Sequence, residues 1–417
     1  MNSPSRLHRI PCLLFVLLLG IALWPQPAMA LPSFARKYQT SCQTCHVGVP
    51  KLNAFGRAFE ANGFRFPAGQ DPEMVKLPRL ELGAEGYKKV FPKAVWPTNI
   101  SLPSLLSMYV VLRTNITPDD PGKTWEFEFP HEIELFGADT IGDHFSYLVE
   151  LAWDEGELGG DAFLQYDYKP ALHVRIGGIN PQAIEFREKN RLTAAHYNYG
   201  EAAPADAVFT LAGEGDAGLE VWGAVNGPGG NGGVRYRAGL VNGNGHTDNN
   251  SAKDVFAGVE YKFLGMGMAG GATEAGSDKP WIDNSVTLGA LWYSGKESIG
   301  YDDKYEYLVG SVSSWTGPVN LLALYSSQTN DNPVGDGVKV KTKAWFLEAD
   351  YVALPWLIPV LRYENTKFGS APAEELVIPN MTFLATANIK FYVEGQIRLD
   401  DAGKDLDKYV VGVNWGF

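Results

Sequence analysis

Cysteine is scarce in this sequence. Three cysteines occur among the 417 residues, at positions 12, 42 and 45, and no second Cys pair follows the one formed by Cys42 and Cys45. A zinc site built from two such pairs would therefore lack half of its ligands. A redox-active pair remains an alternative for Cys42 and Cys45.

Long apolar runs are also lacking. The most apolar stretch, residues 13–23, is too short to span a bilayer stably. Arg6 and Arg9 precede it and Ala28-Met29-Ala30 follows it, which is the order of basic region, apolar core and cleavage site in a secretory signal. We therefore expect residues 1–30 to be a signal peptide that is cleaved before Leu31. An uncleaved anchor is the alternative.

The chain has no excess of positive charge. Lysine and arginine number 35 against 48 aspartate and glutamate residues, which gives a formal net charge of −13 at pH 7. Removing the two arginines of the leader makes this −15. Such a balance argues against nucleic acid as a partner and suits cations.

The pentapeptide Cys42-Gln43-Thr44-Cys45-His46 has the C-x-x-C-H pattern that attaches c-type haem. Two residues between the cysteines match the separation of the haem vinyl groups, and the adjacent imidazole reaches the iron. The pattern predicts one covalent haem c held by Cys42 and Cys45, with His46 as the metal ligand. Export fits this prediction, because c-type haem is attached outside the cytoplasm.

Residues 31–77 are the predicted cytochrome segment. Pro50 suits the first residue of a helix, and an apolar face then recurs at Leu52, Phe55 and Phe59. Asn62-Gly63 is a signal for the end of that helix. We expect the Phe face to cover one side of the porphyrin. Residues 78–103 form a Pro-rich connector, with one extended piece predicted at 80–90.

From residue 105 onward the pattern alternates with period two, in segments of about ten residues separated by turns. With 46 glycines and 51 aromatic residues, this is typical of a transmembrane β-barrel. Sixteen strands are predicted: 105–115, 125–137, 144–154, 161–168, 171–178, 217–225, 232–242, 255–264, 285–294, 304–314, 319–328, 342–352, 357–367, 379–386, 389–399 and 408–417. The last strand ends with an apolar face at Phe417, as bacterial outer-membrane barrels do.

Connection lengths support the same barrel. Such barrels have short periplasmic turns and longer extracellular loops. Starting from a periplasmic N-terminus, short and long connections alternate with few faults, and 264–284 is long for a turn. We interpret 179–216 as one long loop, which either folds into the lumen and narrows it or lies in solvent.

Strand parity predicts which side chains face the lumen. Acidic residues predominate there, among them Glu128, Glu134 and Glu348. The predicted architecture is thus an all-β barrel of about sixteen strands at 104–417, with an acidic lumen and the small α-helical haem segment as a plug. His131 faces lipid by parity, although Pro130 can bulge the strand and reverse this.

The haem segment resembles that of the fused monohaem cytochrome–porins of the bacterial outer membrane, best known from bacteria that oxidise ferrous iron. The resemblance rests on the motif at 41–46 followed by Leu52-Asn53-Ala54-Phe55-Gly56-Arg57-Ala58-Phe59-Glu60-Ala61-Asn62-Gly63-Phe64. It implies an outer-membrane location, with lipid around the barrel. It also implies electron transfer through the haem, from an extracellular donor such as Fe(II) to a periplasmic c-type cytochrome. If the chain is an enzyme, it is an Fe(II):cytochrome c oxidoreductase.

Two alternatives stay open, a solute-diffusion porin with the haem segment as a plug and a haem-based sensor or peroxidase. The sixth iron ligand is also open, and the alternatives are Met74, His144, His173, His196 or an open position. Arg57 is a candidate partner for a haem propionate.

Overall fold

The computed structural model describes residues 33–77, 85–96, 106–118, 122, 124–154, 156–187, 189–202, 211, 215–243, 248–271, 279, 281–298, 300–399 and 407–416. The predicted signal peptide and Phe417 lie outside these residues. Within them, no helix is both long and apolar enough to cross a membrane.

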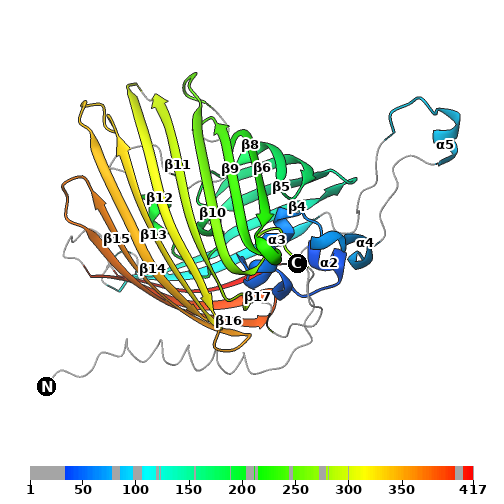
Figure 1. The fold of residues 1–417 in the computed structure, drawn as a ribbon. Coiled ribbons are helices and arrows are strands. Elements are labelled where there is room, and N and C mark those ends of the chain that lie inside the picture. The colour runs from blue at the N-terminus through cyan, green and yellow to red at the C-terminus, as the bar shows by residue number, and fades with distance from the viewer. Residues whose placement is uncertain are drawn as a thin grey trace.

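Sixteen antiparallel strands close into one barrel, because each strand pairs with its neighbours in the chain and β18 pairs with β3 (Figure 1). The strands are β3 Ser107–Ile116, β4 Trp125–Ile141, β5 Phe145–Asp154, β6 Glu157–Lys169, β7 Leu172–Ile179, β8 Asp216–Asn226, β9 Asn231–Val241, β10 Asp254–Met266, β11 Ser285–Ser298, β12 Asp302–Thr316, β13 Val319–Asn330, β14 Val340–Tyr351, β15 Leu357–Phe368, β16 Glu374–Thr386, β17 Ile389–Arg398 and β18 Lys408–Gly416. The predicted barrel of sixteen strands is confirmed, and the strand predicted at 379–386 begins earlier, at Glu374.

The connections are short at one end of the barrel and mostly longer at the other. The short-turn end includes 142–144, 170–171 and 317–318, and the long-loop end includes 180–215 and 242–253. Three connections depart from the pattern: 267–284 is long at the short-turn end, and 155–156 and 299–301 are short at the long-loop end.

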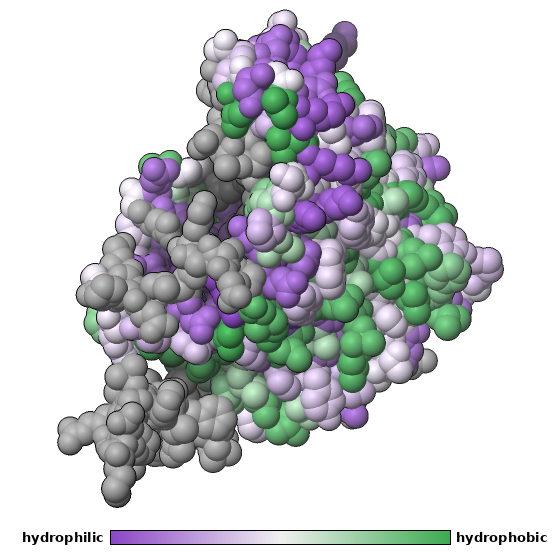
Figure 2. Space-filling view, turned by 90° about the vertical axis from the view of Figure 1, so that its left-hand side faces the viewer, coloured by the Kyte–Doolittle hydropathy of each residue, from purple (hydrophilic) through white to green (hydrophobic). Residues whose placement is uncertain are grey.

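The two faces of the wall differ in polarity, as period-two alternation requires. Apolar side chains such as Trp125, Phe127 and Phe129 are exposed on the outside, whereas Glu348 and Arg362 are buried on the inside. Hydrophobic residues accordingly gather on the side of the barrel in Figure 2. The outside of the wall therefore suits a lipid environment.

Strand β4 contains an irregularity that turns one side chain inward. Val111 pairs with Glu132 but Arg113 pairs with Glu128, so β4 has two more residues than β3 across this stretch. Pro130 lies in the extra stretch, where it has no N–H to give to a ladder. The His131 side chain lies inside this unpaired stretch and is only 13% exposed. Strict alternation therefore fails for His131, and the alternative in which Pro130 bulges the strand and turns it inward is confirmed.

The N-terminal segment, blue in Figure 1, lies at the short-turn end of the barrel. Its elements are α2 Ser33–Tyr38, η2 Cys42–Thr44, β1 His46–Gly48, β2 Lys51–Leu52, α3 Ala54–Ala61, η3 Pro67–Gly69 and α4 Asp71–Met74. Pro50 does not begin the helix as predicted, because it lies in the β1–β2 turn and Asn53 caps α3 instead, accepting from the Gly56 N–H. Helix α5, Glu85–Val90, replaces the extended piece predicted at 80–90.

Ion pairs join this segment to the inner wall. Lys37 lies 2.6 Å from Asp139 of β4, and Lys51 pairs with Asp350 and Glu348 of β14. All five side chains are nearly inaccessible to solvent. Buried charges of one element held by opposite charges of another fix the relative position of the two.

The described part of the connection between β7 and β8 also contacts the inner wall. It contains η5 Ile184–Phe186 and α6 Asn198–Glu201. The backbone N–H groups of Ala194 and Ala195 donate to the Glu394 carboxylate of β17 at 2.7 and 2.8 Å. This connection therefore enters the lumen, the first of the two predicted placements.

Candidate functional site

The two cysteines of the motif lie in one tight turn. Ser41 caps η2 by accepting from the Gln43 N–H, and the Cys45 N–H donates to the Cys42 carbonyl at 3.1 Å. Both cysteines are free thiols. Burial, with a smaller contribution from Cys42, raises the pKa of the Cys45 thiol to about 12. A redox or metal role needs a thiolate, so this environment argues against the redox alternative.

His46 begins β1, directly after the turn. Its Nδ1 lies 2.9 Å from the carbonyl oxygen of Pro50, in the turn between β1 and β2. Burial lowers the pKa of His46, so the ring is neutral at pH 7. A neutral ring that donates from Nδ1 carries its lone pair on Nε2, which is the arrangement of a metal-ligating histidine.

Helix α3 packs directly against this turn. A Cβ on Gly56 would lie 2.2 Å from the Cys45 carbonyl oxygen, so only glycine permits the approach. Phe55 and Phe59 of α3 form an aromatic cluster with Tyr38 and Phe66. The predicted helix end is confirmed, because Asn62 caps α3 and Gly63 has φ of 63°.

A cavity of about 470 Å³ opens between this segment and the barrel wall. Its volume lies in the range of small-molecule and cofactor sites. Cys42, Cys45 and His46 all line it. Its apolar lining includes Phe34, Phe55, Phe59, Phe64, Phe66, Val111, Phe136, Ala138, Leu148 and Phe163. Its basic lining includes Arg113, Arg175, Arg187, Lys189, Arg191 and Lys390.

Among the residues that line the cavity, Lys390 of β17 is the one that a bound anion would stabilise most. Its side chain is 3% exposed, and among the described residues its polar contact is the Leu192 carbonyl oxygen at 3.5 Å. A buried ammonium group is costly without a counter-charge. An apolar cavity with two thiols and an imidazole on one wall and a buried cation on another fits haem c, whose propionates would face the lysine.

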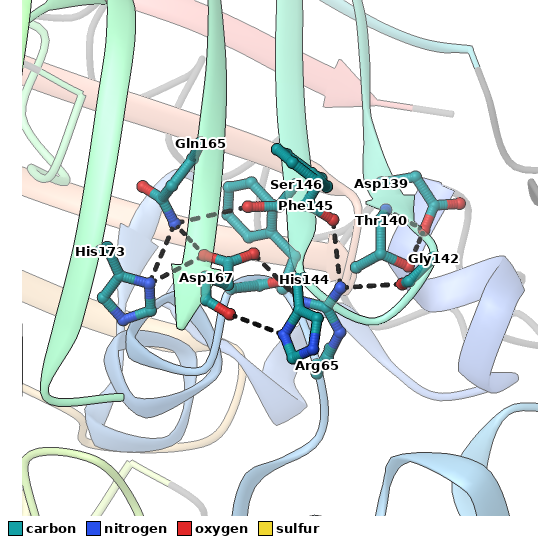
Figure 3. Close-up of polar contacts among 12 residues, drawn as sticks. Arg65, Asp139, Thr140, Gly142, His144, Phe145, Ser146, Gln165, Asp167 and His173 are labelled. Carbon is teal, nitrogen blue, oxygen red and sulfur yellow. Dashed lines mark hydrogen bonds and ion pairs between the residues drawn. The ribbon is translucent and has the colours of Figure 1, made fainter. Parts of the chain in front are cut away.

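Three of the predicted sixth ligands are not among the described residues that line the cavity. His173 lies 2.8 Å from Asp167 through Nδ1 and 3.1 Å from the Ala61 carbonyl oxygen through Nε2, so both ring nitrogens have partners. His144 lies 3.2 Å from the Asp167 carbonyl oxygen (Figure 3). Met74 is 36% exposed on α4. These side chains therefore do not face the position of an iron bound to His46.

Figure 3 also shows what His144 and His173 do instead. Arg65 lies 3.0 Å from Asp167 and donates to the carbonyl oxygens of Gly142 and Phe145. This network ties the end of the helical segment to the turn between β4 and β5.

Two other histidines line the cavity, His196 and His131. His196 was among the predicted ligands, whereas parity had placed His131 outside. The signal that identifies His131 is Pro130, which marks the bulge. Lys390 has no comparable signal, because an inward lysine is ordinary in a polar lumen.

The prediction that Arg57 binds a propionate is not supported. Arg57 lies 3.1 Å from Glu185 of the inserted connection and does not line the cavity. Glu60, one turn later, is held by Arg187 at 2.9 and 3.2 Å. Burial acts to raise the pKa of Glu60, but Arg187 and Arg235 outweigh it and hold the pKa at about 2. These ion pairs join α3 to the connection between β7 and β8.

The part of the chain that the structure describes has no group of three or more His, Cys, Asp or Glu residues arranged to hold a metal ion.

Solved structures with the same fold are outer-membrane porins. OmpF of Salmonella typhi, solved with daunomycin, is 16% identical with a TM-score of 0.55, and the match covers 75% of this chain and 97% of that one. An anion-selective porin from Comamonas acidovorans is 13% identical with a TM-score of 0.50, covering 75% and 98%. No protein-family profile matches the chain, and no curated protein matches its sequence. The chain thus has the porin fold, and these identities extend the likeness to the fold alone.

Proposed function

We propose that this chain is an outer-membrane electron conduit with one covalent haem c, bound through Cys42 and Cys45 and ligated by His46. The observation that carries the proposal is the cavity in which these three residues, an apolar lining and the buried Lys390 meet. When bound, the haem iron would take up and release one electron at a time.

The residues of the chain hold and insulate such a group. The η2 turn presents both thiols to one side of the cavity, and Pro50 fixes the ring of His46. The phenylalanines of α3 exclude water from one face, which tunes the potential of an iron centre. Lys390 and the neighbouring arginines would neutralise the propionates.

The donor in this proposal is an extracellular cation, with Fe(II) as the first choice, and the acceptor is a periplasmic c-type cytochrome. Asp254, Glu297 and Asp303 are buried at the long-loop end, where a negative field raises the local concentration of cations. The cytochrome segment lies at the opposite end, on the periplasmic side in this proposal.

The test uses the purified full-length protein in liposomes that contain a trapped electron acceptor. We expect external Fe(II) or an electrode to reduce the acceptor, and the double variant Cys42→Ser/Cys45→Ser to abolish this reduction. Absence of covalent haem in the purified protein, or equal reduction by the double variant, would overturn the proposal.

A second candidate is a diffusion porin in which the helical segment is a plug, and the porin fold of the barrel favours it. Planar-bilayer recording distinguishes the two functions. Steady conductance of porin size from the haem-loaded protein would support the diffusion porin. A closed barrel that still transfers electrons would support the conduit.

A further inference from the structure

We infer that His131 supplies the sixth ligand to the iron, an inference that rests on the haem proposed above. The first support is position. Among the described residues, His131 and His196 are the histidines besides His46 that line the cavity. His131 comes from the barrel wall and His46 from the helical segment, so the two rings reach the cavity from different elements.

The second support is the bulge in β4. Phe129 is 58% exposed on the outer face, whereas the His131 side chain is 13% exposed. Without the extra residues both side chains would point the same way. Bulges re-aim side chains in this manner, often beside functional sites. The bulge in β4 therefore places the imidazole of His131 on the cavity wall.

The third support is the carboxylate behind the ring. Nδ1 of His131 lies 3.2 Å from Oε2 of Glu128 and 3.8 Å from Asp154. This contact sets a carboxylate beside Nδ1. Ligation of a metal through Nε2 would align Nδ1 with that carboxylate, a pairing common behind metal-ligating histidines.

Glu128 is itself held in place. Arg113 of β3 donates to one carboxylate oxygen, and the Asn115 amide donates to the other at 2.5 Å. The carboxylate beside His131 is therefore held by residues of β3, the strand that pairs with β4. His196 belongs instead to the inserted connection, whose preceding residues are clamped by Glu394 and Arg362.

Ligation by two histidines predicts a low-spin haem in both redox states and a lower potential than His/Met ligation gives. The near-infrared magnetic circular dichroism of the unmodified ferric protein tests this directly. A spectrum typical of two imidazole ligands supports the inference. A high-spin spectrum, or one typical of His/Met ligation, overturns it.

Variants then identify the second imidazole. We expect His131→Phe to convert the haem to a high-spin form that exogenous imidazole returns to low spin. His131→Met should stay low-spin with a raised midpoint potential, and it also serves if the Phe variant folds poorly. The matched control is His196→Phe, which should leave the spectrum unchanged. Loss of the low-spin form in His196→Phe but not in His131→Phe overturns the inference.

This inference and the proposed function fail in different ways. Covalent haem is measured first, as the mass added to the purified chain. Absence of that mass overturns the proposed function and the inference with it. Presence of the haem with a spectrum unchanged in His131→Phe overturns the assignment of His131 alone.

Discussion

At the scale of single residues, the cavity is defined by charges that the sequence pattern does not single out. Lys390 is one of 35 basic residues, and the alternation of β17 says only that it faces inward. Among the described side chains, Glu394 and Glu132 act on it only from beyond ion-pair distance. This becomes visible only when β3, β17 and the helical segment are brought together. In the proposed function, Lys390 would act electrostatically, so its effect would depend on its distance from a bound propionate.

Replacing Lys390 tests this role. We expect Lys390→Met to lower the midpoint potential of the haem, because a nearby positive charge favours the reduced iron by on the order of 1 kcal/mol. Lys390→Arg should retain most of the effect. Lys343→Met, on an exposed position of β14, controls for a general change of charge. A potential equal to that of the unmodified protein in a redox titration would contradict the prediction.

Glu60 gives a pH dependence with a defined sign. Its pKa falls from 4.5 to about 2 in the folded protein, so its ion pairs stabilise fully above pH 4.5. This contribution, on the order of 3 kcal/mol, is lost as the pH falls from 4.5 through 2. We expect Glu60→Gln to weaken the attachment of α3 at neutral pH and to remove this acid-dependent step.

The visible circular dichroism of the haem during acid titration measures that step. Glu73→Gln, at an exposed position of α4, is the matched control and should titrate like the unmodified protein. An acid transition that is unchanged in Glu60→Gln would show that the ion pairs of Glu60 do not hold α3.

At the scale of elements, α3 depends on its close approach to the motif turn. Gly56→Ala places a methyl group 2.2 Å from the Cys45 carbonyl oxygen, which forces α3 away from the cysteines. Overpacking of this kind costs roughly 1–3 kcal/mol. We expect a lower yield of haem-loaded protein and a lower melting temperature of the Soret signal.

Helix α5 provides the control for that substitution. A Cβ on Gly86 meets nothing within 4 Å, and alanine there favours the helix. Gly86→Ala should therefore leave haem loading unchanged. An equal yield of haem-loaded protein from Gly56→Ala and from the unmodified protein would contradict the prediction. It would show that haem attachment does not need the close approach of α3 to the turn of the cysteines.

The elements also show how far sequence reasoning reaches. Alternation predicted all sixteen strands because a barrel strand faces lipid on one side and polar groups on the other along its whole length. It failed at His131, which lies inside the unpaired stretch of β4, although the alternation is the same on both sides of that stretch. The helix start predicted at Pro50 was also wrong, because the hairpin at 46–52 depends on strand pairing that has no periodic signal. The cavity itself required contacts between residues far apart in the chain.

At the scale of the whole molecule, the helical segment and the inserted connection are joined to the wall by buried charge. Lys51 joins the helical segment to Glu348 and Asp350 of β14. Removing one partner of a buried pair typically costs about 3–5 kcal/mol. The barrel should therefore stay closed to ions while these pairs are intact.

Lys51→Met tests this closure. We expect it to leave Asp350 without its cation, while Glu348 keeps Arg362 at 3.6 Å. Frequent open-channel events should then appear in planar-bilayer recordings, where the unmodified protein shows few. Lys341→Met, at an exposed position of β14, should behave like the unmodified protein. Porin-sized conductance from the unmodified protein would show that these ion pairs do not close the lumen.

The seam of the barrel has a consequence for how the protein matures. The first and last strands, β3 and β18, pair with each other, and both line the cavity through residues such as Tyr109 and Asn414. In the proposed function, a porphyrin tied to Cys42 and Cys45 would occupy a space that exists only once these two strands pair. We therefore expect covalent loading to precede closure of the barrel.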